Sequence, residues 1–170
     1  NGIAKAMIVA GSRKNAVEYF HAFNSICLEM NLPFKAIVAY TGEIEGQTED
    51  KLNGFGVSLR NVKKKLENDA FKFLIVAEKF QTGFDEPMLQ TMYVDKKLWG
   101  VAAVQTLSRI NRIYPPLKTD TFVLDFVNTP EEIQEAFEPY YKTTILSEST
   151  DPNKLFDLKD AINNYQVFSG

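Results

Sequence analysis

Short apolar runs alternate along the chain with segments in which apolar residues recur every three or four positions. Buried strands are predicted where such runs are rich in β-branched and aromatic residues, at 6–10, 36–40, 71–77, 90–94 and 121–124. Helical spacing lies between them, at 16–30, 59–66 and 101–113. Strands that are apolar on both sides and separated by helices are typical of a parallel sheet covered on both faces. The pattern therefore predicts an α/β fold, with ligands gathered at the carboxyl ends of the strands.

Two segments depart from this alternation. Residues 41–56 contain several glycines and acidic residues without a period, and we expect a mobile loop there. From Thr129 onward the pattern is helical: Thr129-Pro130-Glu131-Glu132 has the form of a capping box with proline at the first helical position, and a further helix is expected from Asp151. We therefore divide the chain into a sheet domain over 1–128 and a helical extension over 129–170.

The composition is globular and narrows the possible chemistry. Of 170 residues, 45% are hydrophobic and 24% are charged, which excludes a mainly disordered chain. The single Cys27 and single His21 argue against a disulfide framework, a Ser-His-Asp triad and a metal site, and we expect no bound metal in this chain. The net charge of −3 provides no general attraction for nucleic acid, although a local patch could still bind phosphates.

Two further features of the sequence concern membrane association and the start of the chain. No apolar run approaches the roughly 18–20 residues of a membrane span, so we expect no membrane partner. Because the chain opens at Asn1 without a methionine, we expect it to be a piece of a longer protein.

The segment from Gln105 to Arg112 is the strongest candidate for chemistry. On the predicted helix, Gln105, Arg109 and Arg112 are spaced i, i+4 and i+7 and share one face. Two guanidinium groups that point the same way suit a polyphosphate, and such an arginine can neutralise charge on a transferring γ-phosphoryl group. Taken alone, the spacing favours the simpler interpretation of an amphipathic helix with a solvated polar side.

Two further candidates directly follow predicted strands. In Thr82-Gly83-Phe84-Asp85, Gly83 permits close approach of a ligand, Thr82 can bind a phosphate and Asp85 can accept a hydrogen bond from a ribose. In Gly11-Ser12-Arg13, the beginning of a helix offers backbone N–H groups to an anion. An ordinary turn and a serine N-cap are the simpler interpretations of these two segments.

Together these motifs resemble the second RecA-like domain, the C-terminal domain, of superfamily 2 helicases. The segment 105–112 resembles motif VI, Thr82-Gly83-Phe84-Asp85 resembles motif V, and residues 9–13 stand where motif IV belongs. More narrowly, residues 79–128 are similar to the motor (R) subunit of type I restriction endonucleases. The similarity is carried, in this order, by Phe80-Gln81-Thr82-Gly83-Phe84-Asp85-Glu86-Pro87, Met92-Tyr93-Val94-Asp95-Lys96, Gln105-Thr106-Leu107-Ser108-Arg109-Ile110-Asn111-Arg112 and Leu124-Asp125-Phe126. Ser108 departs from the glycine that motif VI often has, which disfavours an RNA helicase.

The resemblance implies a RecA-like three-layer sandwich, with a mainly parallel sheet of about five or six strands and a short C-terminal helical segment. It implies that ATP and Mg²⁺ are bound mainly by a preceding domain that this chain lacks. Arg112 would act as the arginine finger, with Arg109 beside it. Three further residues would meet the nucleotide, namely Gly83, Asp85 and Gln105. Three would contact the DNA backbone, namely Ser12, Arg13 and Thr82.

The function implied is that of a fragment of an ATP-dependent DNA translocase within a type I site-specific deoxyribonuclease. The fragment would be inactive without the preceding P-loop domain, and the enzyme would be cytoplasmic in a bacterium or archaeon. Its partners would be double-stranded DNA, the preceding RecA-like and nuclease domains of the same chain, and the modification and specificity subunits. Two alternatives stay open: another superfamily 2 helicase or remodeller motor, and a non-catalytic α/β ligand-binding module that uses its arginines for a protein partner.

Overall fold

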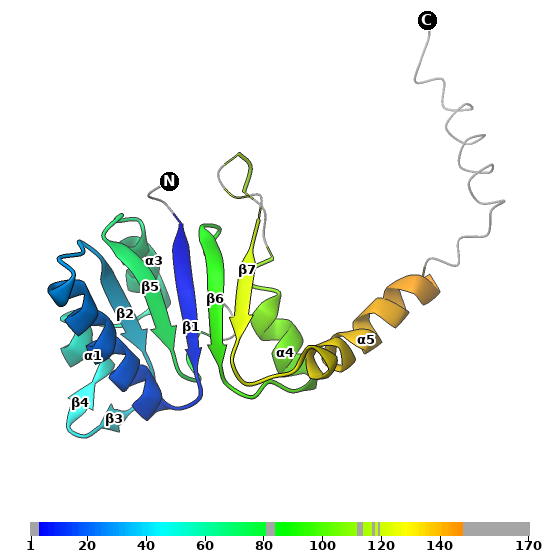
Figure 1. The fold of residues 1–170 in the computed structure, drawn as a ribbon, viewed down its shortest axis with the longest axis horizontal. Coiled ribbons are helices and arrows are strands. Elements are labelled where there is room, and N and C mark those ends of the chain that lie inside the picture. The colour runs from blue at the N-terminus through cyan, green and yellow to red at the C-terminus, as the bar shows by residue number, and fades with distance from the viewer. Residues whose placement is uncertain (1–3, 81–83, 112–113, 117, 119, 148–170) are drawn as a thin grey trace, which may run out of the picture. The chain divides into compact units, whose positions relative to one another are not determined.

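A parallel sheet carries the fold in the computed structural model, which describes residues 4–80, 84–111, 114–116, 118 and 120–147 (Figure 1). Five strands lie in the order β2-β5-β1-β6-β7, and all neighbouring pairs are parallel. Their bounds are β1 Lys5–Ala10, β2 Lys35–Ala39, β5 Phe71–Val76, β6 Leu89–Asp95 and β7 Phe122–Asp125. The predicted α/β fold with a mainly parallel sheet is confirmed.

Helices cover the two faces of the sheet. α1 (Arg13–Glu29) packs on one face through Ala16, Val17 and Phe20. α3 (Leu59–Leu66) and α4 (Gly100–Leu107) pack on the other, in a larger core that includes buried residues of β1, β5 and β6 (Figure 1). The central strands are buried on both sides, which is why they read as continuous apolar runs.

Residues 41–56 do not form the loop that the sequence predicts. They form a hairpin of β3 (Glu43–Ile44) and β4 (Gln47–Thr48), followed by α2 (Glu49–Asn53). The Thr48 side chain accepts a hydrogen bond from the N–H of Lys51 and caps α2, and Gly54 ends it in a left-handed conformation with φ of 71°. Two-residue strands and a five-residue helix are too short to leave a hydrophobic period, so the prediction is wrong here.

α4 ends earlier than predicted, at Leu107 rather than residue 113. Beyond Leu107 the Ile110 N–H donates to Leu107 O and the Asn111 N–H donates to Ser108 O, both at 3.3 Å, so the chain continues in turns closed over three residues instead of four. Further on, Tyr114 and Lys118 exchange backbone hydrogen bonds of 2.9 and 2.8 Å, and the Lys118 ammonium donates to Ile110 O at 2.8 Å. Arg109 therefore lies beyond the helix, and the expectation that it shares a helix face with Gln105 is wrong.

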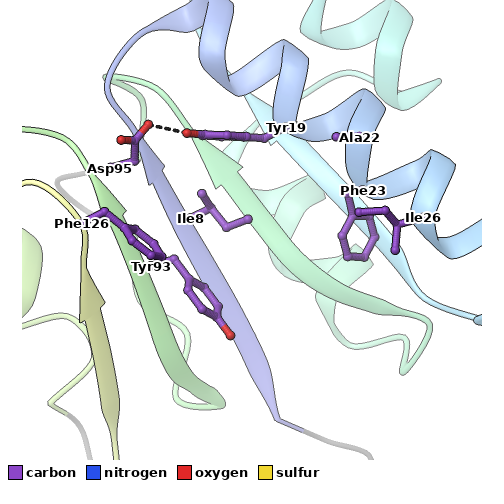
Figure 2. A pocket seen from close by; sticks show the side chains of 8 residues that line it. All are labelled: Ile8, Tyr19, Ala22, Phe23, Ile26, Tyr93, Asp95 and Phe126. Carbon is purple, nitrogen blue, oxygen red and sulfur yellow. Dashed lines mark hydrogen bonds between the residues drawn. The ribbon is translucent and has the colours of Figure 1, made fainter.

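The expected cover on both faces is incomplete at β6 and β7. In the part of the chain that the structure describes, no helix lies over these strands on the face that α1 occupies elsewhere. Tyr93, Phe126 and Ile26 instead line an open apolar groove of about 420 Å³ beside α1 (Figure 2). On β7, Phe122 is 56% exposed and its neighbours Val123 and Leu124 are each 39% exposed, so this edge strand is accessible to water on both faces.

α5 (Pro130–Ser147) begins with the predicted capping box. The Thr129 N–H donates to Glu132 Oε2 at 2.9 Å, and the Glu132 N–H donates to Thr129 Oγ1 at 3.3 Å. By their internal contacts, residues divide into one unit up to Ala136 and a second from Phe137. The helix predicted from Asp151 lies outside the described residues, and none of the described helices is long and apolar enough to cross a membrane.

Candidate functional site

The carboxyl ends of the five parallel strands meet at one edge of the sheet, where ligands bind in α/β folds. Polar residues end or follow each strand at this edge. They are Ser12 and Arg13 after β1, Thr41 after β2, Lys79 after β5, Asp95 at the end of β6 and Asp125 at the end of β7. Of the predicted site residues, Ser12 and Arg13 therefore lie at this edge.

The end of β1 is closely packed against the end of β6. A Cβ atom on Gly11 would lie 2.7 Å from Asp95 O, so only glycine fits at this position. The next residue, Ser12, caps α1 by accepting a hydrogen bond of 3.0 Å from the Asn15 N–H. The Arg13 guanidinium donates to Thr41 O at 2.9 Å and so ties the end of β1 to the end of β2. Ser12 and Arg13 are both exposed, which leaves them accessible to a ligand.

Asp95 holds α1 against the sheet. The Tyr19 hydroxyl donates to Asp95 Oδ2 at 2.5 Å (Figure 2). This hydrogen bond, together with burial, raises the pKa of Tyr19 to about 12. Sequence reasoning missed Tyr19, although the position of Asp95 at the end of a predicted strand was a signal that it would have a partner.

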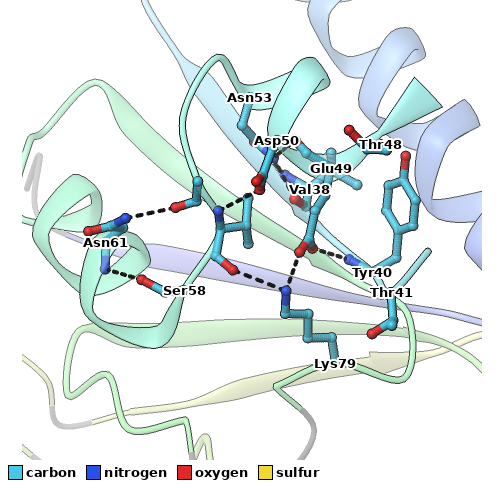
Figure 3. Close-up of polar contacts among 12 residues, drawn as sticks. Val38, Tyr40, Thr41, Thr48, Glu49, Asp50, Asn53, Ser58, Asn61 and Lys79 are labelled. Carbon is cyan, nitrogen blue, oxygen red and sulfur yellow. Dashed lines mark hydrogen bonds and ion pairs between the residues drawn. The ribbon is translucent and has the colours of Figure 1, made fainter. Parts of the chain in front are cut away.

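α2 is fastened to β2 by side chains that bind backbone groups (Figure 3). Asn53 accepts from the Val38 N–H at 3.0 Å and donates to the Val38 carbonyl at 2.7 Å. Glu49 Oε2 accepts from the Tyr40 N–H at 2.7 Å. Asp50 Oδ1 accepts from the Val57 N–H at 2.7 Å. The polar residues of this segment thus satisfy the edge of β2, rather than forming a solvated loop.

Lys79 joins this cluster from the loop after β5. Its ammonium group forms an ion pair with Glu49 and donates to Val57 O at 3.0 Å (Figure 3). The Lys79 side chain is 24% exposed and that of Glu49 is 13% exposed. The sequence analysis gave neither residue a role, because their contact spans 30 positions and leaves no local pattern.

Arg109, in the segment that follows α4, also contacts the loop after β5. Its Nη1 donates to Phe84 O at 2.5 Å, and Phe84 itself is only 2% exposed. Asp85 follows directly and is half-buried, so the structure brings Arg109 to the segment that contains Asp85. Gln105 is exposed on α4. Gly83, Thr82 and Arg112 lie outside the described residues.

No group of three or more His, Cys, Asp or Glu side chains among the described residues is arranged to hold a metal ion. Arg13 and the polar groups at this edge suit an anionic ligand instead.

A comparison with protein families shows which family the chain belongs to. Residues 35–128 match the family model described as type I restriction enzyme subunit R domain 3. The chain belongs to this family. The match contains residues 79–128, which carried the resemblance in the sequence, and it does not include Ser12 and Arg13.

Curated relatives agree with this family. The chain is 28% identical over 153 residues to the type I restriction enzyme HindI endonuclease subunit of Haemophilus influenzae, covering 83% of this chain and 14% of the relative. It is 32% identical over 145 residues to the putative type I restriction enzyme MjaIXP endonuclease subunit of Methanocaldococcus jannaschii, covering 80% of this chain and 13% of the relative. The chain therefore corresponds to a small region of the relatives it matches.

Proposed function

We propose that this chain is the second RecA-like half of the ATP-driven DNA translocase in a type I restriction endonuclease R subunit. A preceding domain with a P-loop binds most of the ATP and the Mg²⁺, and this half supplies arginines and part of the grip on double-stranded DNA. Movement between the two halves, driven by ATP hydrolysis, advances the grip along the duplex. The whole enzyme would also contain a nuclease domain in the same subunit, together with modification and specificity subunits.

The observation that carries this proposal is the hydrogen bond from Arg109 to the Phe84 carbonyl. It joins the segment 105–112 to the loop between β5 and β6, and so brings two of the motifs with candidate chemistry into contact. Both segments belong to the stretch that matches the R-subunit family. The family and this juxtaposition support a shared nucleotide site better than either of the alternatives from sequence.

The two arginines have different tasks in this proposal. The Arg109 guanidinium is engaged by a backbone carbonyl, so we assign it to holding the segment against the loop after β5. Arg112 then stabilises the charge that develops on the γ-phosphoryl group of ATP held by the other domain. We assign Gly83 and Asp85 to binding the ribose side of the nucleotide, and Gln105 to positioning it.

The DNA grip involves Ser12, Arg13 and Thr82. Ser12 and Arg13 are exposed at the carboxyl edge, and the contact between Arg13 and Thr41 holds the arginine at that rim. A phosphate contact needs only local donors, so the net charge of −3 does not oppose it. We propose no metal ligand in this chain.

The decisive experiment measures DNA-dependent ATP hydrolysis by the full-length R subunit assembled with its partner subunits. Arg112→Ala should lower kcat by about 10³-fold or more, because an arginine finger acts mainly in the transition state. The KM for ATP should change little. Arg60→Ala, which removes an exposed arginine from α3, should leave turnover unchanged. Normal turnover in Arg112→Ala would contradict the proposal and favour a binding module.

A second test uses the 170-residue chain alone. The proposal requires that it hydrolyse no ATP, because the P-loop and the Mg²⁺-binding acid belong to the other half. ATPase activity is measured with and without double-stranded DNA, and ATP binding is measured by calorimetry. Hydrolysis at an ordinary enzyme rate of about 1 s⁻¹ or faster would refute the two-halves account.

A further inference from the structure

The loop after β5 leaves the strand in a strained conformation. Glu78 has a φ of 61° and Phe80 a φ of 59°, and neither is a glycine. A non-glycine residue in the left-handed region is strained and persists only where its surroundings hold it there. Lys79 lies between these two residues, so its contacts help to hold this conformation.

Lys79 is held by groups from a distant part of the chain. Its ammonium group is paired with the Glu49 carboxylate, donates to Val57 O at 3.0 Å, and lies 5.4 Å from the centre of the Phe80 ring. Because both members of the ion pair are largely removed from water, the loss of either would leave a poorly solvated charge. The pair is therefore sensitive to small movements of either element.

Glu49 is itself fixed in place. It is the first residue of α2, and its Oε2 accepts a hydrogen bond of 2.7 Å from the Tyr40 N–H at the end of β2 (Figure 3). Asn53 fastens the other end of α2 to Val38. The partner of Lys79 thus stands on a short helix that is anchored to the neighbouring strand.

The far end of the same loop has a separate anchor. Phe84 is buried, and its carbonyl accepts from Arg109. The loop is consequently held at two points. Near β5, Lys79 is bound by α2, which precedes the loop in the sequence. Further along, Phe84 is bound by Arg109, which follows the loop in the sequence. A change in the α2 anchor would alter where the loop begins, while the Arg109 anchor would be unaffected.

We propose that Glu49 is a positioning residue of the motor, which acts through Lys79 to set the loop after β5 in its working conformation. The proposal rests on the proposed function, since the loop leads to the residues assigned to the ribose and to DNA. The segment 41–56 thereby gains a role in coupling the end of β2 to the nucleotide edge. Removing the charge on Glu49 should slow turnover while ATP still binds.

The test measures kcat and KM for DNA-dependent ATP hydrolysis by the full-length assembled R subunit. Glu49→Gln keeps an oxygen acceptor for the Tyr40 N–H and removes only the charge that faces Lys79. It should lower kcat by about 10- to 100-fold, as misplaced site residues do, with KM for ATP changed less than about twofold. Lys79→Met should have the same effect, and the double variant should be no slower than either single one. Lys79→Arg should restore most of the turnover.

Lys97→Met is the matched control. It removes an ion pair of the same kind, from Lys97 to Glu132, after β6 rather than after β5. It should leave kcat unchanged, even where it lowers the melting temperature as much as Glu49→Gln does. Equal losses of kcat in Lys97→Met and Glu49→Gln would show a merely structural role and overturn the proposal. If Lys79→Met does not fold, Glu49→Gln and Lys79→Arg decide the question.

Arg112→Ala is measured alongside to separate the two proposals. If it abolishes turnover while Glu49→Gln is fully active, the positioning role is wrong and the proposed function stands. If Arg112→Ala keeps normal turnover, the proposed function fails, and the positioning role fails with it.

Discussion

A single hydrogen bond from Tyr19 to Asp95 joins α1 to the end of β6. Tyr19→Phe removes the hydroxyl and leaves the ring, so packing is kept while a hydrogen bond to a carboxylate is lost. We expect the free energy of unfolding to fall by about 1.5 kcal/mol at neutral pH. Denaturant unfolding of both proteins measures the difference.

The same pair predicts a pH dependence in alkaline solution. The pKa of Tyr19 is raised to about 12 in the folded chain, against an ordinary value of about 10. A raised pKa means that the folded state favours the protonated phenol. The stabilisation is therefore complete below pH 10 and is lost as the pH rises towards 12. The unfolding free energies of the native chain and Tyr19→Phe should converge across that range, and a constant gap would contradict the assignment.

Gly11 is required by the close approach of β1 and β6. Gly11→Ala would place a Cβ atom 2.7 Å from Asp95 O, and a backbone atom cannot easily move away. We expect a loss of about 2 kcal/mol or more in unfolding free energy. Gly56→Ala is the control, because its Cβ would meet nothing closer than 3.9 Å, and its effect should stay within about 0.5 kcal/mol. Similar losses in both variants would show that the contact is unimportant.

At the scale of elements, the beginning of α5 depends on Glu132. Its carboxylate binds Lys97 and accepts from the Thr129 N–H, and these contacts lower the pKa of Glu132, the hydrogen bond to Lys97 most of all. A lowered pKa gives stabilisation that is present above the unfolded value of about 4.3 and disappears as the pH falls through the folded value. Glu132→Gln should therefore melt at a lower temperature than the native chain at pH 7. The difference should shrink as the pH falls below about 4, as melting curves over that range will show.

The elements differ in how far the sequence predicts them. β1, β2 and β5 were predicted to within one residue, because each is a continuous apolar run. β6 was predicted as closely, although no described helix lies over one of its faces. α2 was missed because its sequence is polar and its stability comes from Asn53, Asp50 and Glu49 binding backbone groups elsewhere. The end of α4 was misplaced because the apolar spacing continues to residue 113, whereas the hydrogen bonds after Leu107 close turns of three residues.

For the molecule as a whole, the core lies where the central strands are covered on both faces. Val76 is fully buried between β1 and β2, whereas Val123 on β7 is 39% exposed. Val76→Ala should lower the unfolding free energy by about 2–3 kcal/mol, since it opens a cavity between packed layers. Val123→Ala should cost less than about 1 kcal/mol, because water already reaches the site. Equal costs in denaturant unfolding would contradict this distribution of the core.

The candidate site was also only partly predictable. Ser12 and Arg13 lie at the carboxyl edge because they directly follow a strand and the ends of parallel strands share an edge, while their roles stay predictions. The contacts of Arg109 with Phe84, and of Lys79 with Glu49, join residues 25 and 30 positions apart. No spacing rule connects such pairs, so neither the anchor role of Arg109 nor any role of Glu49 could be predicted.

The sequence by itself determined the class of fold, the parallel strands and the family, since these follow from local apolar runs and from motifs read in order. Only the tertiary structure decided that residues 41–56 are ordered against β2, that α4 stops before Arg109, and that β7 stays exposed to water. The physical reason is the range of the interactions. Burial periodicity acts within a few residues and is visible along the chain, whereas the polar contacts that place Lys79 and Arg109 exist only once distant segments have come together.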